Sequence, residues 1–470
     1  MKKTSRREFM GYSCASLAAT GLTQLGLGNI AFAETSPLPI NPYRATVCIF
    51  FKGGLDYLDT VIPYDPDSYK ALRNRRSGIF SAYENKDASR EREQLLPLNP
   101  INTAELEGRE FAFTQDLLPL YEMFENQELS ILSGIGPLIE PTSRVTFNNG
   151  SARTPKRLFS HNDQQSVWGS LDIEGTRFGW GGRLLDTLVP QDSPSAIFSS
   201  VATKDADAFL YGENTTPISY NGSMPDIPKL LQGAFIGHKN TQAQGLAEQF
   251  MRQTYSLEED VYQHDIKNRL NRSLVIQDTL RGVLSDVPTI TTIFPEDSLG
   301  QQLRAILELI ALRSRIGIGH QIFYATIGGF DTHTNNVNRL PDLHQSFAPA
   351  MQAFKDGLKE IDEWNNVTTF TASDFGRTLV ENGSGTDHAW ASMQFIMGGA
   401  VKGKHIVGAL PSIDVQADSF TDNRGRWIPE ISVEQLGATL GQWMGANSAD
   451  IEQIFPNLIN FNHKTLDLFV

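Results

Sequence analysis

Short apolar runs that end near glycine alternate along the chain with longer segments of helical hydrophobic spacing. Runs rich in β-branched and aromatic residues span 44–52, 129–133, 321–327 and 367–372, and residues 195–201 form a further candidate. Runs of this length, bounded by turn residues, are typical of strands buried on both faces of a parallel sheet. We therefore predict strands at these places.

Two segments near these runs predict amphipathic helices. Ser298 and Gln301 have the spacing of a capping box, and apolar residues then recur at i, i+3, i+4 and i+7 as far as about Arg315. Residues 343–363 place their apolar side chains on one helical face. Strand, helix and strand in this order form a βαβ unit, so the predicted fold class is α/β with a mostly parallel sheet.

The first 33 residues predict an export signal rather than part of the fold. Ser5-Arg6-Arg7-Glu8-Phe9-Met10 is a twin-arginine pattern, and a mildly apolar stretch leads from it to Ala31-Phe32-Ala33, a small-residue cleavage site. An uncleaved membrane anchor is the less favoured alternative because the stretch contains Ser, Thr, Gln and Gly. We predict export by the twin-arginine machinery to the periplasm or the extracellular space, with no stable membrane span in the mature chain.

Residues 34–470 are predicted to form one domain, because α/β enzymes often use this length as a single domain with insertions. Helix-compatible spacing and few Gly or Pro residues over 241–285 predict a helical insertion within about 205–295. The formal net charge is −14 and no basic cluster follows the signal, so nucleic acid is not an expected partner. Cys48 alone remains after cleavage, which excludes an internal disulfide.

Acidic residues and histidines follow the predicted strand ends. They are Asp56, Asp331 with His333, Asp374, and His388 a little further along. Ligands of open α/β sheets bind outside the carboxyl ends of the strands, and carboxylates that converge there repel one another unless a cation neutralises them. The pattern therefore predicts a divalent metal site. Taken singly, each Asp could instead cap a helix, and His333 could be structural.

These side chains do not determine which metal ion binds. Carboxylate and imidazole together suit Zn, Mn or Fe, whereas an all-oxygen site would suit Mg or Ca.

A nucleophile candidate lies in the segment Arg157-Leu-Phe-Ser160-His161-Asn-Asp163. A serine at the head of a helix beginning near Asn162 has helix N–H groups beside it, which favour an anion. A Ser followed three residues later by Asp is equally a plain helix-capping pattern. Arg157 and Arg377 could bind an oxyanion through two N–H groups, or could equally pair with neighbouring carboxylates.

Several motifs together resemble the DUF1501 proteins, an exported family of unknown function placed in the alkaline phosphatase and sulfatase superfamily. The resemblance covers nearly the whole predicted mature chain. The motifs are Phe51-Lys-Gly-Gly-Leu-Asp56, Phe178-Gly-Trp-Gly-Gly-Arg183, Gly328-Gly-Phe-Asp-Thr-His333, Thr371-Ala-Ser-Asp-Phe-Gly-Arg-Thr378, Gly385-Thr-Asp-His-Ala-Trp390 and Gly398-Gly-Ala-Val-Lys-Gly403.

The resemblance implies an alkaline phosphatase-like three-layer α/β/α sandwich with one or two metal ions at the strand ends. By resemblance, Asp331, His333 and His388 form one metal site, while Asp56 and Asp374 face a second ion beside Ser160. Two departures matter. Phe375 stands where the superfamily has a histidine after its Asp, so one nitrogen ligand is absent, and no sulfatase-type Cys-x-Pro-x-Arg motif occurs.

Two functions follow as expectations. The first is a metal-dependent hydrolase of a phosphate or related ester, acting on a small-molecule or polymer substrate. The alternative is a noncatalytic periplasmic binding or scaffold protein that retains the fold, with or without one metal, which Phe375 and the capping interpretation of Ser160 favour.

Overall fold

The central feature of the fold is a nine-stranded mixed sheet whose middle strand is the first strand of the chain. In a computed structural model that describes residues 43–84, 90–222, 287–470 and isolated positions within 272–283, the strand order is β13-β5-β12-β9-β1-β8-β6-β7, with β14 also paired to β5. The strands are β1 (Arg44–Lys52), β5 (Leu129–Gly136), β6 (Ser200–Ala202), β7 (Ile218–Ser219), β8 (His320–Gly328), β9 (Val367–Ser373), β12 (Ser392–Met397), β13 (Ile406–Gly408) and β14 (Ile431–Ser432).

Most neighbours in this sheet are parallel, as predicted. Strand β1 is parallel to both β8 and β9, so that Ala45 pairs with Gln321 on one side and with Val367 on the other. Only β12 runs against its neighbours β9 and β5 within the described sheet. Because β8, β1 and β9 are adjacent and parallel, their carboxyl ends lie side by side.

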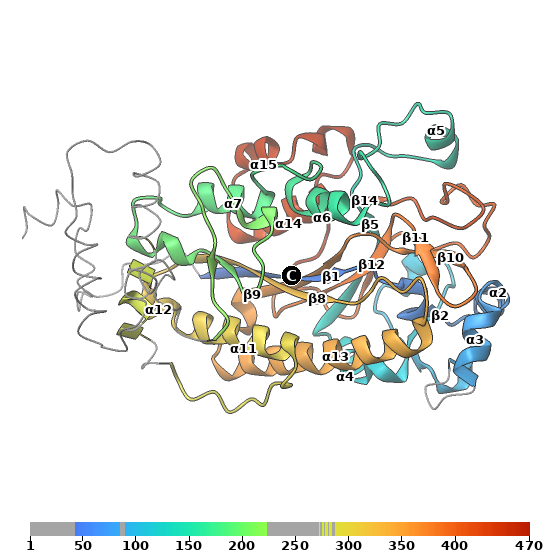
Figure 1. Ribbon diagram of the computed structural model, residues 1–470, viewed down its shortest axis with the longest axis horizontal. Helices are drawn as coiled ribbons and strands as arrows, with labels where there is room; N and C mark the ends of the chain where they lie inside the picture. Colours follow the sequence, from blue (N-terminus) through green and yellow to red (C-terminus); the bar gives the residue numbers. More distant parts are fainter. Residues whose placement is uncertain are drawn as a thin grey trace, which may run out of the picture. The chain divides into compact units, whose positions relative to one another are not determined.

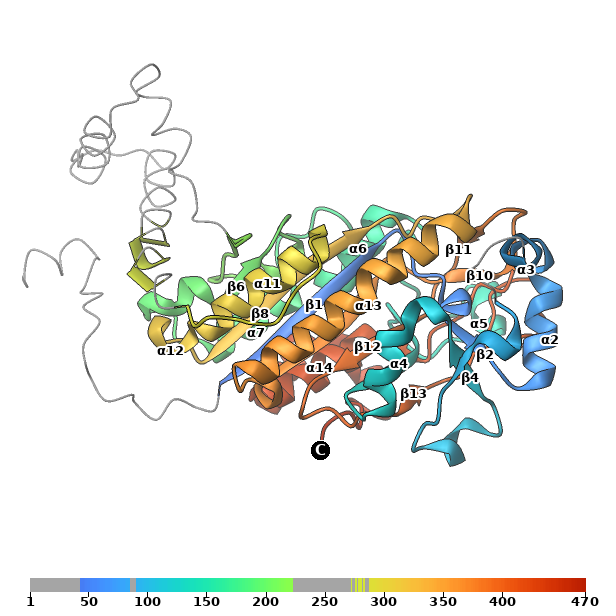
Figure 2. The same cartoon turned by 90° about the horizontal axis from the view of Figure 1, so that it is seen from below.

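Helices cover both faces of the sheet. One face packs against α4 (Leu118–Glu125), α11 (Ser298–Ala311) and α13 (Asn336–Glu360), and the other packs against α6 (His161–Ser170), α7 (Trp180–Leu188), α14 (Val433–Met444) and α15 (Ser448–Ile454) (Figure 1). Figure 2 looks onto the first face, where α11 and α13 run side by side. This arrangement confirms the three-layer α/β/α sandwich.

Two hydrophobic cores fill the spaces between the layers. Residues of β1 alternate between them: Val47, Ile49 and Phe51 belong to the core under α11 and α13, whereas Cys48 and Phe50 belong to the core under α7 and α14. A strand that is buried on both faces is apolar along nearly its whole length. This property explains why the run 44–52 lacks polar alternation.

Smaller elements lie beyond the carboxyl ends of the central strands. The helices there are α2 (Pro66–Arg75), α3 (Ser77–Glu84) and α5 (Arg144–Asn148), whereas α12 (Arg313–Ile316) lies just before the start of β8, at the other end of the sheet (Figure 1). Two small sheets join β2 (Val61–Pro63), β4 (Phe111–Phe113) and β3 (Leu96–Pro97), and β10 (Arg377–Glu381) with β11 (Thr386–His388). None of the described helices is both long and apolar enough to cross a membrane.

Some predicted boundaries were wrong. The expected strand over 195–201 is a short 3-10 helix, Pro194–Phe198, followed by β6, because a proline suits the first position of a helical turn. Helix α13 begins at Asn336 rather than near residue 343. The N-cap of α11 is Asp297, whose carboxylate accepts a hydrogen bond from Gly300 N at 2.8 Å, and not Ser298.

Two predictions concern segments that the structure does not describe in full. The export signal, 1–33, lies outside the described residues. So does most of the helical insertion predicted within 205–295, although its isolated described positions within 272–283 are helical. Its described flanks, 205–222 and 287–295, are not α-helical and contain strand β7.

Candidate metal centre

Four side chains converge just beyond the carboxyl ends of β8 and β9. Asp331 and His333 follow β8, His388 ends β11, and His161 is the first residue of α6. The Oδ1 atom of Asp331 lies 3.3 Å from His333 Nε2, 3.5 Å from His388 Nε2 and 3.6 Å from His161 Nε2. We call these four residues the imidazole cluster.

The geometry of the imidazole cluster suits a metal ion. Ligand atoms from His161, Asp331 and His388 all lie within 4.8 Å of one another. His333 lies beside this group: its Nε2 atom is at hydrogen-bond distance, 2.7 Å, from that of His388, so one of the two nitrogens carries a proton when no ion lies between them. Three imidazole nitrogens and one carboxylate oxygen are a common ligand set for first-row transition metals.

Each imidazole is oriented by a partner on its outer nitrogen. The Nδ1 atom of His161 lies 2.5 Å from Asp374 Oδ2, and that of His333 lies 3.2 Å from Asp387 Oδ1. The Nδ1–H of His388 donates to the carbonyl of Phe159 at 2.8 Å. Carboxylate and carbonyl oxygens accept hydrogen bonds, so they hold the proton on Nδ1 and turn Nε2 toward the cluster, as in metal-binding histidines.

His161 provides a direct test of whether the residues fit a metal. Its Nε2 atom is buried and has no hydrogen-bond partner among the described residues. A buried polar atom without a partner costs free energy, and a cation beside the Nε2 lone pair would remove that cost. The donor set therefore fits a bound divalent ion.

Neighbouring groups tune the pKa values of the imidazoles in opposite directions. The hydrogen bond and charge of Asp374 raise the pKa of His161 despite its partial burial. Burial lowers the pKa of His388, and the positive charge of Arg377 adds to this effect. A neutral His388 keeps a lone pair for a metal at neutral pH.

Arg377 holds the carboxylate ligand and three loops together. Its buried guanidinium donates to Asp331 Oδ1 at 2.5 Å and to the carbonyls of Gly53, Gly54, Phe330 and Thr386. Burial raises the pKa of Asp331, but the hydrogen bond and charge of Arg377 outweigh this effect, so the pKa is lowered overall. The structure thus places Arg377 as a support for Asp331, which is the carboxylate-pairing alternative and not the oxyanion clamp.

The glycine after β1 permits this close assembly. Gly53 has φ +121°, and a Cβ atom there would lie 2.2 Å from Asp331 N. Its own N–H donates to Asp374 Oδ2 at 3.2 Å. A residue with a side chain would therefore push apart the loops that carry Asp331 and Asp374.

Phe375 fills the space beside two of the imidazoles. Its buried ring lies 4.8 Å from the His161 ring and 4.4 Å from the His388 ring, between centroids. The imidazole on the other side of this ring, His161, comes from α6. Sequence reasoning missed His161 because Ser160 and Asp163 around it explained the segment as a helix cap.

The predicted nucleophile pairs with its own helix. Ser160 is the N-cap of α6, and its hydroxyl donates to Asp163 Oδ2 at 2.7 Å. Arg157 also pairs with Asp163, at 3.3 Å between Nη1 and Oδ1. Ser160 thus occupies the N-cap position of α6 but its hydroxyl accepts no backbone N–H there, and Arg157 follows the carboxylate-pairing interpretation. Phe159 between them has φ 73° and directs its carbonyl to His388.

The structure does not bring Asp56 to the imidazole cluster. Both of its carboxylate oxygens accept from Arg76 Nη1, at 2.8 and 3.0 Å, and the pair is almost completely buried. Thr386 also donates to this carboxylate at 3.3 Å. Asp56 thus neutralises a buried arginine, which accounts for its charge without a metal.

Asp374 lies one hydrogen bond away from the expected ion. Its Oδ2 atom receives hydrogen bonds from His161, Gly53 and Gln165, the last at 3.1 Å. We expect Asp374→Asn to weaken metal affinity about 10- to 100-fold, because a neutral amide orients and polarises His161 less well. Isothermal titration with Zn²⁺ measures this change.

The same titration separates two roles for Asp374. Its Oδ1 atom is buried without a partner among the described residues. Complete loss of binding in Asp374→Asn would contradict the orienting role and make Asp374 a direct ligand.

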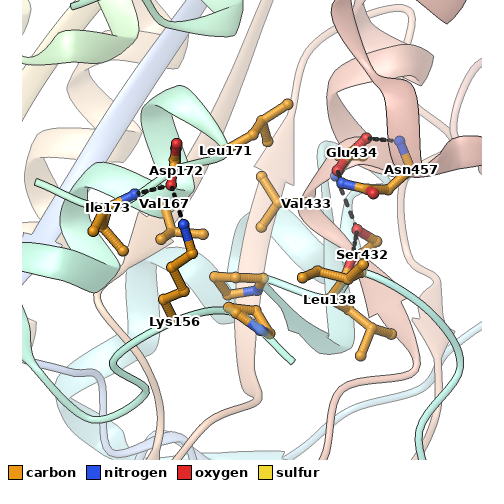
Figure 3. A pocket seen from close by; sticks show the side chains of 13 residues that line it. Leu138, Lys156, Val167, Leu171, Asp172, Ile173, Ser432, Val433, Glu434 and Asn457 are labelled. Atoms are coloured by element: carbon orange, nitrogen blue, oxygen red, sulfur yellow. Dashed lines mark hydrogen bonds and ion pairs between the residues drawn. The ribbon is translucent and has the colours of Figure 1, made fainter. Parts of the chain in front are cut away.

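A separate cavity of about 220 Å³ lies between α6 and α14 (Figure 3). Its walls are mainly apolar, with Val167, Leu171 and Val433 among them, and Glu434 on one side is held by Asn457. No residue of the imidazole cluster lines it. This cavity is therefore distinct from the candidate metal centre.

Comparison with solved structures finds distant similarities. The crystal structure of Ps i-CgsB in complex with k-i-k-neocarrahexaose is 11% identical, covering 89% of this chain and 76% of that chain, with a TM-score of 0.29. The PsFucS1 sulfatase from Pseudoalteromonas sp. is 8% identical, covering 87% of this chain and 69% of that chain, with a TM-score of 0.34. No curated protein matches the sequence.

A family model gives the clearer relationship. The model described as "Protein of unknown function (DUF1501)" matches residues 142–447, well over half of the chain. The matched segment contains all four residues of the imidazole cluster. The chain therefore belongs to the DUF1501 family.

Proposed function

We propose that this protein is an exported, metal-dependent hydrolase of a phosphate or related ester, of the alkaline phosphatase and sulfatase superfamily. The observation that carries the proposal is the convergence of three imidazole Nε2 atoms on Asp331 Oδ1, each imidazole being held by a partner on Nδ1. Export through the twin-arginine machinery is part of the proposal and rests on residues 1–33.

His161, Asp331, His333 and His388 would hold one divalent ion. Their mixed nitrogen and oxygen donors favour zinc, manganese or iron over magnesium or calcium. Phe375 occupies the space beside His161 and His388, which favours one ion over two. A bound ion would supply Lewis-acid polarisation of the ester and neutralise charge that develops as the ester bond breaks.

The side chains of the imidazole cluster are open to solvent on one side. The Asp331 side chain is 45% exposed and that of His333 is 41% exposed. Structural metal sites are closed by protein ligands, whereas catalytic sites keep one position for water or substrate. This exposure supports a catalytic use of the metal.

Two helices begin at the imidazole cluster and favour an anionic substrate. His161 is the first residue of α6, and α13 begins at Asn336, shortly after His333. The N-terminal end of a helix carries partial positive charge and exposes N–H groups, both of which stabilise an anion. A phosphate or sulfate ester would meet this field at the metal.

A second candidate is a noncatalytic binding or scaffold protein that retains one metal. The observation in its favour is that Ser160 and Arg157 both pair with Asp163 and not with the imidazole cluster. Under this candidate, the metal would hold the loops beyond β8 and β9 in place without turnover.

Metal analysis combined with ester turnover decides between the candidates. We expect protein purified without chelators to hold about one ion per chain, and to hydrolyse a phosphate or sulfate monoester once loaded with zinc or manganese. Asp331→Ala and His388→Ala should lose both properties while keeping the native circular dichroism spectrum. Metal without turnover on either ester class would support the scaffold candidate, and a folded wild type without metal would contradict the hydrolase and leave the binding or scaffold candidate.

A further inference from the structure

We propose that Arg339 binds the anionic group of the ester at this metal centre. The inference rests on the proposed function and adds a residue that would favour a negatively charged substrate. It concerns a side chain on the first turn of α13, next to the loop that carries Asp331 and His333.

The guanidinium of Arg339 lies against the Asp331 loop. Its Nη1 atom donates to the main-chain carbonyl of Asp331 at 3.3 Å. Its Nη2 atom would be 3.7 Å from a Cβ atom placed on Gly329, so the group also lies close to that glycine. The side chain is exposed to solvent. These contacts place a positive charge beside a predicted ligand and within reach of a solute.

The charge of Arg339 is not compensated by a carboxylate among the described residues. Other arginines of the cluster and of the segments around it each have one. These pairs are Arg377 with Asp331, Arg157 with Asp163, Arg424 with Asp387 and Arg426 with Asp422. Arg339 forms no ion pair within the described part of the chain, and its one described hydrogen bond is to a carbonyl.

This arrangement fits one ligand chemistry. A guanidinium presents five N–H groups in a planar fork, and two of them match two oxygens of a phosphate or sulfate. One N–H of Arg339 is used by Asp331 O, which holds one end of the group at this loop, and the others have no partner among the described residues. The N-terminal end of α13 adds positive potential at the same place. The expected ligand is therefore a tetrahedral oxyanion.

Titration with simple oxyanions tests the assignment. Inorganic phosphate and inorganic sulfate are titrated separately into the zinc-loaded full chain, and the metal content of each variant is measured. We expect Arg339→Gln to raise the Kd of the preferred anion about tenfold or more, with metal content unchanged. Arg339→Lys should recover part of the affinity, because the charge remains but the fork is lost.

Arg304→Gln is the matched control. Arg304 is an exposed arginine on α11 that pairs with Glu308 at 3.3 Å, and its replacement should leave both anion affinities unchanged. An Arg339→Gln variant with the wild-type Kd for both anions would overturn the inference. So would loss of metal in that variant, since Arg339 would then serve to hold Asp331.

The result is separable from failure of the proposed function. A wild type that binds metal but neither anion contradicts the role of Arg339 alone. A wild type without metal contradicts the hydrolase. Because Arg339 itself is expected to contact the oxyanion, the Kd of the preferred anion should be higher in Arg339→Gln than in the wild type in metal-free protein as well. Equal Kd values in the two metal-free proteins would overturn the inference.

Discussion

Replacement of His161 by alanine is expected to remove stoichiometric metal from the protein. His161 contributes an Nε2 atom that is buried without a partner and that points to Asp331. Loss of an outer hydrogen bond to a metal-binding histidine weakens metal affinity roughly 10- to 100-fold. Loss of the imidazole itself should exceed that range, so zinc should be absent after gel filtration. Elemental analysis of the purified variant measures the effect.

His405→Ala provides the control for His161→Ala. His405 is also partly buried, but its Nδ1 atom bonds the carbonyl of Gly403 and it lies outside the imidazole cluster. It should keep the wild-type metal content. Full metal content in His161→Ala would contradict the ligand assignment, and equal metal loss in both variants would point to a general effect of histidine removal on folding.

Asp56→Ala is expected to destabilise the protein by about 3–5 kcal/mol without acting on the metal. The substitution removes the carboxylate to which Arg76 Nη1 donates both of its hydrogen bonds, and it leaves the Arg76 guanidinium buried. An uncompensated buried charge is among the costliest changes a single substitution makes. Urea-induced unfolding followed by tryptophan fluorescence gives the loss in unfolding free energy.

A double variant separates the lost ion pair from lost packing. Asp56→Leu combined with Arg76→Met removes both charges and should recover much of the stability that Asp56→Ala loses. The folded fraction of Asp56→Ala should still bind zinc with the wild-type stoichiometry. Loss of zinc at unchanged stability would restore Asp56 to the metal site and contradict the structural role.

The comparison of Asp56 with Asp331 shows what the sequence could reveal about the site. Both follow an apolar strand and a pair of glycines, so their local patterns are nearly the same. Their roles differ because of their partners. Arg76, at the end of α2, pairs with Asp56 and buries it, whereas Asp331 pairs with Arg377 and still lies close to three imidazoles. Local spacing could predict that acidic groups meet beyond the sheet. It could not predict which arginine each one meets.

The fold was more predictable than the site for a similar reason. Strands β1, β8 and β9 are rich in β-branched and aromatic residues and end at glycine or a polar turn, which are local properties. The short strand β6 was misplaced because the 3-10 helix that begins at Pro194 takes up most of the apolar run before it. The antiparallel direction of β12 depends on its partners β5 and β9. The direction in which two strands pair depends on segments far apart in the chain, so the hydrophobic periodicity of one strand cannot predict it.

The position of β1 in the middle of the sheet has a consequence for the order of folding. This first strand gains its two partners only when β8 and β9 exist, and Ala45 pairs with both Gln321 and Val367. Contacts between such distant segments close long loops and slow the search for the native state. The central sheet, and with it the imidazole cluster, can therefore assemble only after most of the chain has been synthesised. Until then the apolar run 44–52 is exposed and prone to aggregation, so it is a segment that chaperones would bind.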